Sequence, residues 1–241
     1  MRDALVNGIR QEAEKGARGK CLCCGANVIA KCGSIRCNHW AHENKGACNY
    51  SKKELKTQWH IDWQNYFPQE WQETRCVDGT TGEVHIADIK TPDGLVVEFQ
   101  HSYLEPKERF ARERYHKSMI WMVDGTKFKK LIKNFTKMFP YISAITEETF
   151  PLYTVKWVEK YLPERWLAAT VPLYYDFRTE EKENADNNEQ KSLREPIWGF
   201  FRIEKTIVAV SMSYNRFVDH VQSGDIRNIE QYVISTLKKH Y

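Results

Sequence analysis

The chain has 241 residues, of which 41% are hydrophobic and 13% aromatic, so it can bury a sizeable core as one large domain or two smaller ones. Its formal net charge is modest, at +4. No run of about 18 apolar residues occurs, and the charged N-terminus has no apolar segment typical of a secretory signal. We therefore expect no membrane partner and a cytoplasmic location.

The charge is distributed unevenly along the chain. Residues 1–60 carry 11 Lys and Arg against 5 Asp and Glu, and residues 103–140 carry 10 against 4, so each segment has a net charge of +6. An acidic, Asn-rich stretch at 180–189 offsets them. Basic segments of this kind favour a polyanionic partner such as nucleic acid, although solvated charged helices would give the same count.

The first chemical signal is a concentration of cysteine. Six of the seven cysteines fall between Cys21 and Cys48. A disulfide framework would need an oxidising compartment, for which the sequence carries no signal, so metal binding is the better interpretation. Reduced cysteines packed as small apolar side chains are the alternative.

The spacing of these residues indicates zinc. Cys21 and Cys24 form a C-x2-C pair followed by a glycine, and His39 and His42 form an H-x2-H pair. Zinc prefers four such ligands, usually as two close pairs. We predict a structural zinc ion bound by these four side chains, with Cys48 as the alternate fourth ligand. A unit this small would depend on the metal to fold.

The flanking segments carry weaker signals. Residues 1–18 are expected to form a short helix or a loose arm. Residues 51–67 are expected to form a helix, because Ser51 and Glu54 make a capping box and aromatic residues recur at helical spacing. His60 lies beside the buried face of that helix.

A strand-rich region follows the helix. Three short segments with strand composition, separated by turn residues, predict an antiparallel meander at 70–76, 83–90 and 95–100. The second turn is Thr91-Pro92-Asp93-Gly94, in which proline presets φ at the second position. A helix at 105–116 and a buried strand at 119–123 come next, so the order is helix, three strands, helix, strand.

The remaining segment gives only element predictions. We expect a basic amphipathic helix at 126–139, a second short helix at 162–169 and a strand at 171–178. A surface loop at 179–195, a hairpin at 197–211 and two final helices at 213–222 and 225–239 are expected to follow.

Two acids stand out in the meander, Asp88 on its second strand and Glu98 on its third. Gln100 shares a face with Glu98, because alternate side chains of a strand point the same way. Acids within apolar strands must be compensated, and a divalent cation is one way of doing this. Mg²⁺ needs few protein ligands, so these residues predict a Mg²⁺ or Mn²⁺ site suited to phosphodiester hydrolysis. Salt bridges at a sheet edge are the alternative.

Taken together, these motifs resemble the PD-(D/E)XK nuclease superfamily and, within it, the competence protein CoiA-like family. The resemblance covers most of residues 20–125. It rests on the cysteine pair with HWAH, on WHIDW around His60, on HIADIKT around Asp88, on VEFQHS from Val97, and on the R-x2-R-x2-Y helix at 109–115. It implies metal-dependent cleavage of DNA, associated with the uptake and recombination of transforming DNA.

The resemblance also implies roles for single residues. His60 occupies a first-helix position near the metal, Asp88 is the motif aspartate, and Glu98 matches the (D/E) of the motif. Gln100 stands where the superfamily usually has lysine, and glutamine cannot supply a positive charge. Lys90 is a candidate substitute, on the same strand face as Asp88.

The predicted fold is of the α+β or α/β class, in three parts. A zinc-binding module at 1–50 precedes a restriction-endonuclease-like (αβββαβ) core at 51–125, and an α+β region at 126–241 has no assigned role. We predict a Mg²⁺- or Mn²⁺-dependent deoxyribonuclease with His60, Asp88, Glu98 and Gln100 in its catalytic site. The alternatives are a catalytically degenerate DNA-binding recombination mediator, or a nuclease effector acting on DNA or RNA in antiviral defence.

Overall fold

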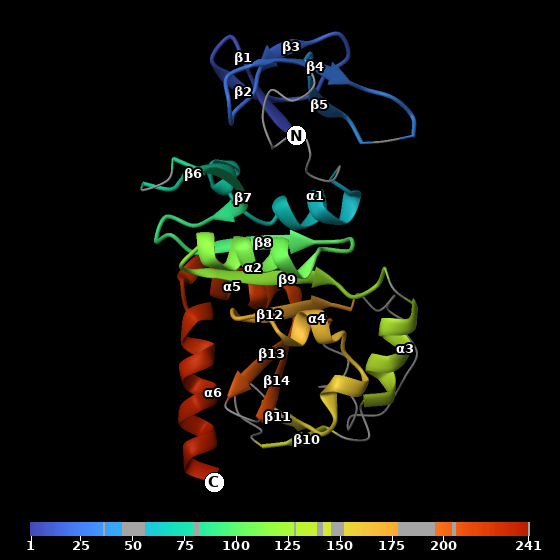
Figure 1. Cartoon of the computed structure of the whole chain (residues 1–241), viewed down its shortest axis with the longest axis vertical. Coiled ribbons are helices and arrows are strands. Elements are labelled where there is room, and N and C mark those ends of the chain that lie inside the picture. The colour runs from blue at the N-terminus through green and yellow to red at the C-terminus, as the bar shows by residue number, and fades with distance from the viewer. Residues whose placement is uncertain are drawn as a thin grey trace. The chain divides into compact units, whose positions relative to one another are not determined.

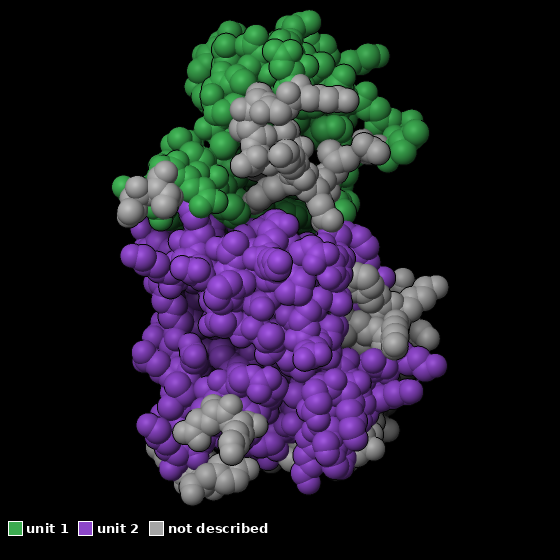
Figure 2. Space-filling view, in the orientation of Figure 1, with its two compact units in different colours: residues 1–90 green, residues 91–241 purple. Residues whose placement is uncertain are grey.

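The computed structural model describes nine stretches of the chain, residues 1–35, 37–44, 56–79, 82–127, 129–138, 142–145, 152–177, 196–203 and 206–240. Over these residues the fold is mixed α+β, with six α-helices and two sheets (Figure 1). The chain divides into two compact units, Met1–Lys90 and Thr91–Tyr241, which Figure 2 shows in different colours. The predicted three-part division stays a prediction. Cys48, the capping box and the 179–195 loop lie outside the described residues.

Unit 1 begins with an antiparallel sheet in the order β2-β1-β3-β4-β5. Its strands are β1 Asp3–Val6, β2 Ile9–Glu12, β3 Arg18–Lys20, β4 Asn27–Lys31 and β5 His39–His42. The prediction of a helix or loose arm over 1–18 is therefore wrong. Val6 pairs with Ile9, so Asn7 and Gly8 form a two-residue hairpin loop, and their φ angles of 53° and 82° are the left-handed values that such loops require.

A small apolar core lies within this sheet. Ala4, Val28 and Trp40 are almost completely buried, and the indole N–H of Trp40 donates to the Gln11 carbonyl oxygen at 3.0 Å. Cys21, 2% exposed, belongs to the same cluster. The cysteine-rich module therefore has an apolar core of its own beside its cysteines.

The rest of unit 1 is one helix and one strand pair. The helix α1 spans Gln58–Gln64, followed by a 3-10 turn at Gln69–Trp71, and β6 (Gln72–Val77) pairs antiparallel with β7 (Val84–Lys90). Within the described residues, a continuous helix from 56 to 67 is wrong. Thr57 has an extended backbone and caps the helix, its hydroxyl accepting from the His60 N–H at 3.4 Å, and the helical turns end before Phe67.

Unit 2 contains a mixed run of strands in the order β10-β11-β14-β13-β12-β9-β8. Its strands are β8 Val96–Gln100, β9 Met119–Asp124, β10 Ile142–Ala144, β11 Leu152–Val155, β12 Leu173–Asp176, β13 Ile197–Ile203 and β14 Thr206–Met212. β8, β9 and β12 run parallel, and the other neighbours are antiparallel. Its helices are α2 Pro106–Tyr115, α3 Lys129–Met138, α4 Glu164–Leu167, α5 Tyr214–Ser223 and α6 Ile226–His240, with a 3-10 turn at Val158–Lys160.

The helix α2 connects the parallel strands β8 and β9 and lies across one face of them (Figure 1). It opens with Pro106, as expected, because the first helical turn needs no N–H from that position. Glu113 of α2 accepts from the indole N–H of Trp121 on β9 at 3.0 Å. This packing holds the polar face of α2 over the strand that carries Glu98.

The order helix, three strands, helix, strand is confirmed along the chain as α1, β6, β7, β8, α2 and β9. The turn before β8 is also confirmed, since the Gly94 N–H donates to the Thr91 carbonyl oxygen at 2.9 Å. The two short strands β10 and β11 were not predicted. A restriction-endonuclease-like core stays a prediction. Within the described part of the chain, no helix has the length and apolarity needed to cross a membrane.

Candidate functional site

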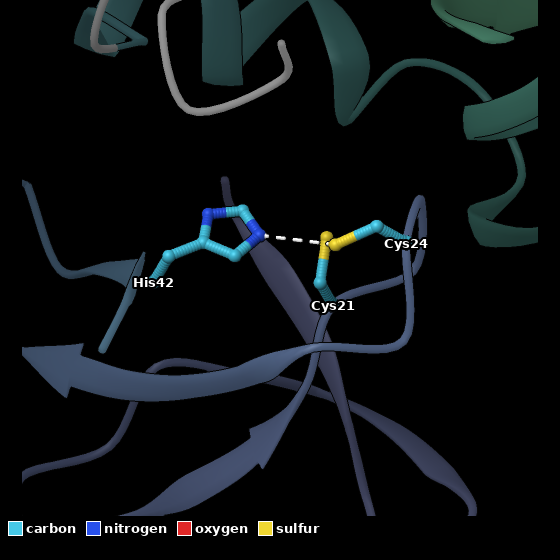
Figure 3. A group of neighbouring side chains, drawn as sticks. All are labelled: Cys21, Cys24 and His42. Carbon is cyan, nitrogen blue, oxygen red and sulfur yellow. Dashed lines mark hydrogen bonds between the residues drawn. The ribbon is translucent and has the colours of Figure 1, made fainter. Parts of the chain in front are cut away.

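Three of the predicted zinc ligands converge in unit 1. The ligand atoms of Cys21, Cys24 and His42 all lie within 4.8 Å of one another, and Cys24 Sγ is 3.4 Å from His42 Nε2 (Figure 3). Around a tetrahedral zinc ion, with bonds of about 2.3 Å to sulfur and about 2.0 Å to nitrogen, these two atoms would be about 3.5 Å apart. The thiol and imidazole donors and their spacing therefore fit a metal ion.

The two cysteines are held by a tight knuckle between β3 and β4. The Cys21 N–H donates to the Ala26 carbonyl at 2.8 Å, and the Gly25 N–H donates back to the Cys21 carbonyl at 2.9 Å. Gly25 has a φ of 72°, where a glycine is favoured. The Cys23 N–H lies 3.3 Å from Cys21 Sγ, an N–H···S contact that stabilises a thiolate. This is the tight turn that the C-x2-C-G spacing predicts.

His39 does not join this group. His39 and His42 begin and end the strand β5, and residues three apart on a strand point to opposite faces. His39 Nδ1 lies 3.0 Å from the Cys37 carbonyl oxygen instead. The prediction treated H-x2-H as a close pair on one turn, and the extended backbone separates its two rings. Cys48 lies outside the described residues.

The environment of His42 suits a ligand. Burial is the main cause that lowers the pKa of His42. A lowered pKa favours the neutral ring, which is the form that binds a metal. The Cys/His group is thus a metal-binding candidate by both geometry and protonation.

A second polar cluster in unit 1 surrounds Asp88 on β7. His60 Nε2 of α1 lies 3.1 Å from Asp88 Oδ1, so two residues predicted to share a catalytic site are in contact. Lys56 Nζ lies 3.5 Å from the same oxygen. Asp88 is 6% exposed, so its charge is balanced by these neighbours rather than by bulk water.

Glu73, which the sequence interpretation missed, completes this cluster. Its carboxylate is buried and lies 2.7 Å from Lys56 Nζ, and it accepts from the Arg2 N–H at 3.3 Å. Burial by itself raises the pKa of Glu73, but Lys56, the N-terminal ammonium and the hydrogen bond from Arg2 together outweigh it, and the pKa falls to about 2. The residue has a φ of 47°, a left-handed value that is costly outside glycine and is often found near functional sites. No motif marks Glu73 or Lys56 in the sequence.

The remaining predicted site residues belong to unit 2. Glu98 on β8 is fully buried, and Arg112 Nη1 of α2 lies 3.2 Å from its Oε2. The ligand atoms of Glu98 and His116, at the end of α2, lie within 4.8 Å of each other. Gln100 is 6% exposed, and its side-chain amide donates to the Ser102 carbonyl at 3.1 Å. Glu98 is therefore a buried carboxylate whose charge is balanced by Arg112 of α2.

The comparison with family models gives one match. Residues 8–51 match the family described as "Competence protein CoiA, N-terminal domain". The matched segment contains Cys21, Cys24 and His42, so it covers the metal-binding candidate. No curated protein and no solved structure matches the chain. The likeness to the CoiA family is thus carried by the N-terminal segment and supports a competence-related role.

Proposed function

We propose that this protein is a metal-dependent nuclease that cleaves the phosphodiester bonds of DNA in a competence-related process. The observation that carries the proposal is the contact between His60 and Asp88, at 3.1 Å, because the sequence predicts both residues in the catalytic site. The CoiA-type N-terminal segment supports the biological setting.

Asp88 and Glu98, on strands that follow one another in the chain, would bind the catalytic cation. Carboxylate oxygens are the donors that Mg²⁺ and Mn²⁺ prefer, so the donor set fits. When bound, such an ion neutralises the phosphate and makes water a better nucleophile. This placement of the ion is part of the proposal.

The protein's own cations would complete the site. Gln100 has no charge to offer in place of the usual lysine, but the Lys56 ammonium lies 3.5 Å from Asp88 and the Arg112 guanidinium 3.2 Å from Glu98. When a metal ion binds the two carboxylates, Lys56 and Arg112 would each be available to attract a phosphate oxygen of the substrate. His60 would orient Asp88 through its ring nitrogen.

We propose that the Cys21/Cys24/His42 group binds Zn²⁺ in a structural role. Thiolate and imidazole ligands favour zinc over magnesium. The ion would link the turn that holds the two cysteines to the strand β5 and so stabilise the sheet. The basic N-terminal segment, which belongs to this sheet, would then bind DNA.

The test is a cleavage assay on linear and circular DNA with and without Mn²⁺. Asp88→Asn and Glu98→Gln are expected to reduce cleavage at least about 100-fold, and circular dichroism verifies that each variant is folded. Asp93→Asn is the matched control, because Asp93 is an exposed acid on the turn between the two strands and pairs with Arg227. If both site variants cut as fast as the control, the proposed site is wrong. A matched RNA substrate in the same assay separates deoxyribonuclease from ribonuclease activity.

A non-catalytic DNA-binding mediator is the second candidate, and Gln100 is the observation that favours it. A parent protein that binds DNA but does not cleave it would establish this alternative. Gln100→Lys would then be expected to introduce cleavage if only the missing charge prevents it.

A further inference from the structure

Unit 2 contains a cavity of about 330 Å³ that the proposed nuclease site does not use. It is lined by residues from β9, β12, β13, β14, α4 and α6. The volume lies at the lower end of the range for small-molecule sites, about 300–1,000 Å³, which suits a ligand of nucleotide size.

Part of the lining of this cavity is apolar. Its buried wall includes Trp166, Phe200, Phe201 and Ile120, each at most 5% exposed. Trp166 is itself held by a ring contact with Trp121 of β9, with centroids 5.4 Å apart. These side chains give one part of the cavity an apolar surface against which a planar base can pack.

The rim of the cavity carries more positive than negative charge. Lys117, Arg202 and Arg227 contribute three positive charges and Glu230 one negative charge. Arg227 is already neutralised, because its guanidinium pairs with Asp93 and its Nε donates to the Ser118 hydroxyl at 3.3 Å. Lys117 and Arg202 are exposed and make no ion pair among the described residues. Arg202 contacts only a carbonyl there, that of Leu167 at 3.4 Å.

This combination fits one ligand class. Two cations without acidic partners bind a phosphate, a carboxylate such as Glu230 accepts from hydroxyl or amino groups, and the apolar wall covers a base. A purely apolar ligand would leave the cations unused, and a bare anion would leave the wall exposed. We propose that this cavity binds a nucleoside monophosphate, either free or as the terminal nucleotide of a DNA strand.

The test is isothermal titration of the full-length, zinc-loaded chain with deoxyadenosine 5′-monophosphate in the absence of Mg²⁺ and Mn²⁺. We expect submillimolar binding at one site, and weaker binding of deoxyadenosine and of inorganic phosphate. Arg202→Gln and Lys117→Gln are each expected to weaken binding about tenfold, since each removes a charge-assisted contact. Lys137→Gln on α3 removes an exposed cation that does not line the cavity, and should change nothing.

Three outcomes would overturn the inference. They are no binding at millimolar nucleotide, equal loss in the Lys137 control, and binding that Glu98→Gln abolishes while Arg202→Gln leaves it unchanged. The last would place the nucleotide at the acidic site instead. A 5′-phosphorylated single strand that competes more strongly than the free nucleotide identifies the strand end as the source, and weaker competition identifies the free nucleotide. Because cleavage is not the readout, failure here leaves the nuclease proposal standing, and the reverse also holds.

Discussion

The two polar clusters of unit 1 are built on opposite principles. Cys21, Cys24 and His42 bring together two thiols and an imidazole, which are the donors that zinc prefers. Asp88 and Glu73 are also donors, but Lys56 lies between them at 3.5 and 2.7 Å. The donors of the first cluster fit a metal ion, and the acids of the second cluster already have a countercharge in the chain.

This difference matches the roles proposed for the two clusters, a structural metal site and a catalytic site. A structural metal must stay bound, and converging thiol and imidazole ligands meet this requirement. A catalytic carboxylate must exchange partners during a reaction, and a lysine that balances its charge beforehand lets the folded state exist without the ion. The predictions below test each half of this comparison, beginning with the largest effect.

Loss of the metal is expected to have the largest effect. Cys24 is exposed, so Cys24→Ser removes a ligand without disturbing the apolar core. Structural zinc sites contribute about 10–16 kcal/mol of apparent binding free energy, so the variant should lose its metal and the N-terminal sheet should melt. Metal content by mass spectrometry and circular dichroism measure this. Cys37→Ser is the control, and equal metal loss in both variants would contradict the assignment.

Removal of the internal cation is expected to come second. Lys56→Met leaves Glu73 buried without its ion-pair partner, which should cost about 3–5 kcal/mol of unfolding free energy. Urea unfolding monitored by tryptophan fluorescence measures the change. Lys90→Met, at a partly exposed position on β7, is the matched control and should cost under about 1 kcal/mol. Similar losses in both would show that the Lys56 cluster is not a stabilising feature.

The pH dependence should show the same cluster. Burial alone would raise the pKa of Glu73, but Lys56 and the N-terminal ammonium together lower it to about 2, from an ordinary value near 4.5. A folded-state pKa below the unfolded one gives stability that is complete above about pH 4.5 and is lost as the pH falls toward 2. About 2.5 pH units correspond to about 3 kcal/mol. Glu73→Gln should flatten the acid limb of unfolding free energy against pH, and an unchanged limb would be inconsistent with this origin.

The smallest effect is expected at His39. His39→Ala should retain the metal and lose under about 1 kcal/mol, because His39 is on the opposite face of β5 from His42. His42→Ala should lose most of the metal. A metal content that falls equally in both variants would restore the original four-ligand prediction.

Much of this could be read from the sequence where local chemistry decides the structure. The C-x2-C-G spacing predicted the knuckle, Pro106 predicted the start of α2, and the turn at Gly94 was correct. These signals work because a single residue type fixes the backbone. The Asn7-Gly8 hairpin carried an equally local signal that the expectation of a helix overlooked.

The errors arise where the structure depends on distant partners. The HWAH spacing suggests a pair of ligands on one turn. In the structure this segment is the strand β5, paired with β4, and its extended backbone places His39 and His42 on opposite faces. Glu73 and Lys56 are 17 positions apart and become partners only through the fold. Such pairs leave no spacing signature, so a buried ion pair is harder to predict than a knuckle.

The most direct test of the central claim is calorimetric titration of the zinc-loaded protein with Mn²⁺. We predict saturable binding in the parent chain that is lost in both Asp88→Asn and Glu98→Gln and kept in Asp93→Asn. Saturable binding that survives both site variants, or no binding in the parent, would contradict a catalytic cation held by these two carboxylates.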